Sequence, residues 1–115
     1  MGSQKMVSLN SSAARAAAET KLLQFLCDAH GDLAARRRML GMLGNYFWRT
    51  HDNTIFFECI RELFPRAPGQ IGAHLPAILT QRGFPDMPCE LLALPSELTA
   101  PVALALAEDL LHRKK

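Results

Sequence analysis

The chain has 115 residues, of which 49% are hydrophobic and 21% charged, and its formal net charge is +2. This length supports one hydrophobic core but not two independent ones, and the mild charge argues against electrostatically driven nucleic-acid binding, which needs a strongly basic face. No apolar run approaches the roughly 20 residues that span a bilayer, and residues 1–21 lack the hydrophobic core of a signal sequence. We therefore expect a soluble, cytoplasmic protein that is not associated with a membrane.

The pattern of apolar residues predicts an all-α fold. No segment alternates between apolar and polar residues over a useful length, as a half-buried strand would. We expect residues 1–12 to be a disordered segment and residues 13–115 to form a single compact domain of five or six short helices.

The first predicted helix begins at Ser11 or Ser12 and stops by His30–Gly31. Its residues are strong helix formers, and the glycine can adopt the left-handed conformation that closes a helix. Its apolar face is built from Ala18, Leu22, Leu23, Phe25 and Leu26.

The second predicted helix is capped by Asp32 and ends at Gly44–Asn45. Its arginine run, Arg36, Arg37 and Arg38, is expected to point mostly outward. Three consecutive helical residues span about 200 degrees of the circumference, so the run does not form a one-sided stripe. A solvated face is the simpler interpretation, and contact with nucleic acid or an acidic protein is the alternative.

An aromatic cluster separates the second helix from the third. It consists of Tyr46, Phe47 and Trp48. We expect these rings to pack in the core, although exposed aromatic rings would be able to stack on bases. The third predicted helix runs from about His51 to Phe64, with Thr50 as its cap, and is stopped by Pro65. Asp52 falls in its first turn, where a negative charge complements the helix dipole.

Prolines and glycines divide the rest of the chain. The fourth predicted helix spans about Gly72 to Arg82, with Pro76 in its first turn, and Gly83 closes it. A short helix is predicted around Cys89 to Ala93. The last helix begins after Thr99 and ends in a basic turn that includes residues 113–115.

Helical spacing also predicts which side chains are buried and which lie off the main apolar stripes. The expected core positions are Leu22, Leu26, Leu40, Leu43, Phe47, Ile55, Phe56, Ile60, Leu79, Leu106 and Leu110. Phe25 and Leu111 lie off the stripes, so they are the candidate residues for an intermolecular interface.

The three cysteines, Cys27, Cys59 and Cys89, are an odd number and lie about thirty residues apart without a CxxC pair. Zinc sites usually offer paired ligands at short spacing. We therefore expect all three cysteines to be reduced, buried thiols. Two of them lie in apolar helical contexts, where cysteine acts as a small hydrophobe.

The sequence offers no strong catalytic signature. His51–Asp52 invites comparison with metal-dependent phosphohydrolases, but the other histidines do not supply a matching pattern, and a helix N-terminus is the simpler interpretation. Neither a glycine-rich phosphate loop nor a local nucleophile–base arrangement is present. We therefore expect no enzyme activity, no catalytic residues, no bound metal and no cofactor.

Three segments resemble the N-terminal helical domain of DnaB-type replicative helicases and, more distantly, the helicase-binding domain of bacterial primases. They are AAETKLLQFLCD at residues 17–28, FWRTHDNTIFFECIREL at residues 47–63, and IGAHLPAILTQRG at residues 71–83. The resemblance implies an all-α fold in a stand-alone domain. In that family the domain mediates self-association and contact with primase.

These features favour a small non-enzymatic module for protein–protein interaction. It would bind a protein partner in a replication-like setting or associate with itself. The alternative is a nucleic-acid-associated accessory protein that uses Arg36, Arg37, Arg38 and the basic C-terminal end.

Overall fold

The computed structural model describes residues 12–112, so most of the predicted disordered segment and the basic end at residues 113–115 lie outside the described residues. Five α-helices and two short 3-10 helices make up the described part. They are α1 (Ser12–Cys27), α2 (Leu33–Met42), η2 (Leu43–Asn45), α3 (His51–Leu63), α4 (Ile71–Gln81), η3 (Glu90–Ala93) and α5 (Ala100–His112). Residues 12–112 contain no strand, and the predicted all-α fold is confirmed. None of these helices combines the length and the apolar character that a membrane crossing requires.

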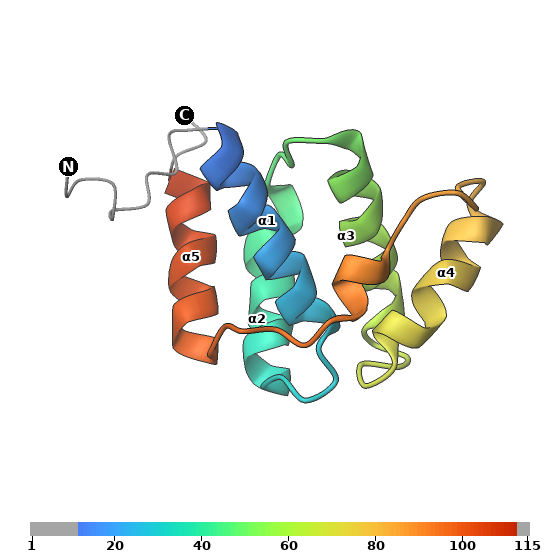
Figure 1. The fold of residues 1–115 in the computed structure, drawn as a ribbon. Helices are drawn as coiled ribbons and strands as arrows, with labels where there is room; N and C mark the ends of the chain where they lie inside the picture. The colour runs from blue at the N-terminus through green and yellow to red at the C-terminus, as the bar shows by residue number, and fades with distance from the viewer. Residues whose placement is uncertain (1–11, 113–115) are drawn as a thin grey trace.

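Helix α1 lies in the middle of the arrangement and packs against α2, α3, α5 and η3 (Figure 1). Helix α5 lies at one edge beside α1 and α2, and α4 lies at the other edge beside α3 (Figure 1). In the view of Figure 1, the chain from η3 to α5 crosses in front of the C-terminal end of α1. This arrangement leaves η3 at the surface between α1 and α4.

Local capping explains where α2 and α3 begin. The Asp32 carboxylate accepts a hydrogen bond from the Ala35 N–H at 3.0 Å, and the Thr50 hydroxyl accepts one from the Asn53 N–H at 3.0 Å. Each bond satisfies an N–H that has no partner within its own helix. The predicted caps Asp32 and Thr50 are confirmed, and α3 ends two residues before Pro65.

Helix α4 confirms Gly83 as a closing residue but corrects the position of Pro76. Gly83 has a φ of +93° and donates to the Thr80 carbonyl at 3.0 Å, while Phe84 donates to the Leu79 carbonyl at 2.8 Å. This pair of bonds is the Schellman arrangement. Since α4 begins at Ile71, Pro76 lies in its second turn and not in the first. Its ring therefore removes one bond inside the helix.

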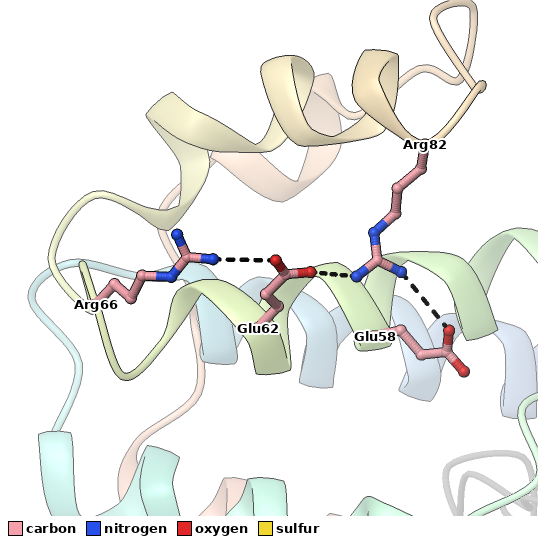
Figure 2. Close-up of polar contacts among 4 residues, drawn as sticks. All are labelled: Glu58, Glu62, Arg66 and Arg82. Atoms are coloured by element: carbon pink, nitrogen blue, oxygen red, sulfur yellow. Dashed lines mark hydrogen bonds and ion pairs between the residues drawn. The ribbon is translucent and has the colours of Figure 1, made fainter.

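An exposed ion-pair network joins α3 to α4 (Figure 2). Glu62 on α3 contacts Arg66 at 3.0 Å and also Arg82 beyond the end of α4. Arg82 lies 3.9 Å from Glu58, one turn earlier on α3. Exposed pairs of this kind contribute less than about 1 kcal/mol each, so the network adds little to the stability of the α3–α4 contact.

Most of the predicted core positions are confirmed as buried: Leu22, Leu26, Leu40, Leu43, Ile55, Phe56, Ile60, Leu79 and Leu110. Leu106 is only partly buried. Phe47 is the error, because 79% of it is exposed. The backbone is extended at Tyr46, where ψ is 140°, so successive side chains point to opposite sides. Tyr46 and Trp48 point inward, and Phe47 points outward.

Candidate functional site

A buried carboxylate on α1 organises the connection between α2 and α3. Glu19 is fully buried and accepts a hydrogen bond from the Tyr46 hydroxyl at 2.6 Å. It also accepts from the Arg49 N–H at 3.0 Å and from the Asn53 side-chain amide at 2.9 Å. A buried carboxylate needs such partners to offset its lost hydration. Glu19 therefore ties residues 46–53 to the centre of the fold.

Tyr46 occupies the middle of this network. Burial, followed by the hydrogen bond to Glu19, raises the pKa of the Tyr46 hydroxyl to about 12. The same oxygen accepts a hydrogen bond from Arg15 Nε at 3.2 Å. The neutral hydroxyl thus both donates and accepts. Trp48 packs edge-on against the Tyr46 ring, with 4.9 Å between ring centroids.

Arg36 is the second buried charged residue, and the prediction that it points outward is wrong. Its Nε and Nη2 donate to the Leu26 carbonyl at 3.1 and 2.9 Å, and Nη2 also donates to the Pro68 carbonyl. Leu26 lies in the last turn of α1, where carbonyls lack partners within the helix. Burial lowers the pKa of Arg36. Arg36 therefore joins α1, α2 and the loop before α4.

The other two arginines of the run remain exposed, so the three candidate basic contacts are not on one surface. Arg37 lies above the Phe64 ring, at 5.7 Å from its centroid. Arg36 lies above the same ring, at 5.1 Å. Of the three arginines in this run, only Arg37 and Arg38 are exposed and thus available for contacts with another molecule.

Sequence position contained a signal for both buried charges. Glu19 precedes three core leucines by three, four and seven residues: Leu22, Leu23 and Leu26. Arg36 precedes Met39, Leu40 and Leu43 by the same intervals. These intervals place a charged residue within the apolar stripe of its own helix.

The candidate interface residues have different environments. Phe25 is only 2% exposed, so its place on the apolar face of the first helix is confirmed and the expectation that it is available for an interface is wrong. Because α1 has neighbours on several sides, its buried surface is wider than one stripe. Leu111 is partly buried against the core near the end of α5. Phe25 thus belongs to the interior of this chain.

His51 and Asp52 lie exposed at the start of α3. Asp52 is in the first turn, as predicted. Among residues 12–112, no group of three or more histidine, cysteine, aspartate or glutamate side chains is arranged to hold a metal ion. The structure thus places both residues at a helix N-terminus.

The three cysteines are free in the described structure. The prediction of buried thiols is confirmed for Cys27 and Cys59 but is wrong for Cys89, which is partly exposed. Burial raises the pKa of the Cys27 thiol to about 12. Burial also raises the pKa values of Cys59 and Cys89.

Two exposed leucines lie at η3, Leu91 within it and Leu94 directly after it. Leu91 is 59% exposed and Leu94 is 51% exposed. The Leu94 N–H bonds to the Leu91 carbonyl at 3.3 Å, and residues three apart in a 3-10 turn lie on the same side. The turn therefore places both side chains on one side, and we call this pair of leucines the η3 ridge.

A hollow lies on each side of the η3 ridge. The α1–α3 hollow, about 310 Å³, is lined by Leu91 with residues of α1 and the start of α3, including Leu23, Asp52 and Phe56. The α1–α4 hollow, about 500 Å³, is lined by Leu94 with the end of α1 and the start of α4. Its walls include Asp28.

Side-chain hydrogen bonds hold the η3 ridge on α1. The Gln24 amide donates to the Leu91 carbonyl at 2.8 Å, and the Ser96 N–H donates to the Asp28 carboxylate at 3.0 Å. Leu92, between these anchors, is buried in the core. The exposed leucines are thus presented by a segment that is fixed at both ends.

Comparisons with protein-family models, with curated proteins and with solved structures give no significant match.

Proposed function

We propose that this chain is a non-enzymatic helical interaction module that docks a protein partner on the η3 ridge. The observation that carries the proposal is the joint exposure of Leu91 and Leu94 between two hollows. Contiguous apolar surface flanked by polar residues marks interaction sites. A partner would bury both leucines and place its own side chains in the hollows.

The anchoring of the ridge supports a binding role. Gln24 and Asp28 hold the segment in place before any partner arrives. A surface that is ordered in advance loses less conformational entropy on binding. The exposed leucines are therefore suited to act as interface anchors.

The resemblance to the helicase N-terminal domain supports the same class of function. That domain acts by contacting copies of itself and primase. We propose, by analogy, an adaptor in a replication-like assembly or a self-associating module. The alternative as a nucleic-acid-associated protein has less support, because Arg36 is committed to carbonyls inside the fold.

Affinity capture with matched baits tests the proposal. The baits are the wild type, a Leu91→Glu/Leu94→Glu double variant and a Phe47→Glu control. The control replaces another exposed apolar side chain, one that lines neither hollow beside the η3 ridge. Circular dichroism establishes that all three are folded. We expect a specific protein to be recovered with the wild type and the control but lost with the double variant. Identical capture profiles for the wild type and the double variant, including empty ones, would contradict the proposal.

A further inference from the structure

The charges around the η3 ridge are predominantly negative. The segment that carries the η3 ridge, residues 83–98, contains Asp86, Glu90 and Glu97 but neither lysine nor arginine. Glu90 is exposed and adjoins Leu91. Each hollow also has an aspartate in its wall, Asp52 in the α1–α3 hollow and Asp28 in the α1–α4 hollow. The apolar ridge thus has an acidic border.

This border favours one class of partner. An acidic rim repels nucleic-acid phosphates and anionic membrane surfaces, and it attracts lysine and arginine side chains. The apolar part needs a partner with regularly spaced aliphatic side chains. An amphipathic helix supplies both features, since its apolar residues recur at intervals of three and four and its flanks carry charge.

We infer that the η3 ridge binds a cationic amphipathic helix of a partner protein. Two apolar side chains of that helix would straddle Leu91 and Leu94 and enter the two hollows. Its lysine or arginine side chains would lie against Asp52 and Glu90. This inference rests on the proposed function and adds the chemistry of the partner to it.

Lys21 allows a test of whether charge near the η3 ridge affects binding of the partner. It is exposed on α1, one turn before Gln24, whose amide holds the ridge. A positive charge there opposes a cationic partner. Removing it is expected to strengthen binding, whereas removing the charges of Asp52 and Glu90 is expected to weaken it.

The test uses the full chain and three synthetic helical peptides of about 15 residues, roughly four helical turns. The peptides share one leucine stripe and carry lysine, glutamine or glutamate on both flanks. Fluorescence anisotropy gives each dissociation constant. We expect the lysine peptide to bind at least about tenfold more tightly than the glutamate peptide, because like charges across an interface are unfavourable.

Variants of the chain complete the test. Asp52→Asn/Glu90→Gln should reduce the preference for lysine at least about threefold, and Lys21→Gln should increase it. Leu91→Glu/Leu94→Glu should abolish binding of the glutamine peptide. Equal affinities for the three peptides, all lost in the double leucine variant, would overturn the inference that the partner is cationic. They would still support the η3 ridge as a docking surface. Failure of all three peptides also overturns the inference, while affinity capture decides the proposed function separately. Light scattering tests whether the ridge binds a second copy of this chain. A dimer that becomes a monomer in the Leu91→Glu/Leu94→Glu variant would identify the second copy as the occupant and would also overturn the inference.

Discussion

The Tyr46 hydroxyl donates a hydrogen bond of 2.6 Å to the buried carboxylate of Glu19, although the two residues lie 27 positions apart. This bond joins the middle of α1 to the extended segment before α3. It also explains why Tyr46 and Trp48 are buried while Phe47, between them, is exposed. Two inward aromatic residues on an extended backbone leave the intervening side chain facing solvent.

The Tyr46 network predicts a delayed ionisation of the single tyrosine. In the folded protein, ultraviolet absorbance should report a midpoint near the raised pKa of about 12, against the ordinary value of 10.0 in denaturant. Because the folded state holds this proton more tightly, the corresponding stability is present below pH 10 and lost as pH rises toward 12. Tyr46→Phe should remove this pH dependence. A midpoint near 10 in a protein that is still helical would contradict the burial of Tyr46.

Neighbouring aromatic residues should respond differently to truncation. Trp48→Ala empties a core site and should cost about 3–5 kcal/mol of unfolding free energy. Phe47→Ala removes an exposed ring and should change the free energy by less than about 0.5 kcal/mol. Urea denaturation of both variants measures the difference. Equal losses would show that Phe47 is packed as the sequence pattern first suggested.

The arginine run offers a second matched comparison. Arg36→Ala leaves the carbonyls of Leu26 and Pro68 without their donors and should destabilise the protein by about 2–4 kcal/mol. Arg38→Ala on the exposed side of the same helix should have an effect within about 0.5 kcal/mol. Thermal and urea unfolding give both values. Similar free energies of unfolding for the two variants would contradict the burial of Arg36.

Local rules predicted the ends of the helices, because a cap depends on residues within one turn. Asp32, Thr50 and Gly83 are examples. The roles of Glu19 and Arg36 could not be obtained in this way, since their partners lie 10 to 34 positions away in the chain.

The spacing of apolar residues also could not predict which residues form the candidate interaction surface. The burial of Phe25 follows from the central position of α1, which is a property of the packed fold. Exposure of Leu91 and Leu94 depends on a 3-10 turn and on its anchors in α1. The sequence predicted a short helix around Cys89 to Ala93 but not that Leu91 would face solvent while Leu92 is buried.

The cysteines should differ in their reaction with a thiol-specific disulfide reagent. Cys89 is partly exposed and should react first. Cys27 and Cys59 are buried, and the Cys27 pKa of about 12 leaves little thiolate near neutral pH. They should react only when the fold opens. Cys89→Ser should therefore eliminate the fast phase, and a fast phase that persists in this variant would contradict the burial of the other two thiols.

Site-specific photo-crosslinking in intact cells tests the docking role of the η3 ridge most directly. A photoreactive residue replaces Leu94 in one variant and Gln81 in another, because Gln81 is exposed on α4 and lines neither hollow beside the ridge. We expect a discrete crosslinked protein from position 94 that is absent from position 81 and is lost when Leu91→Glu is added. Equal crosslinking from both positions, or none from position 94, would contradict it.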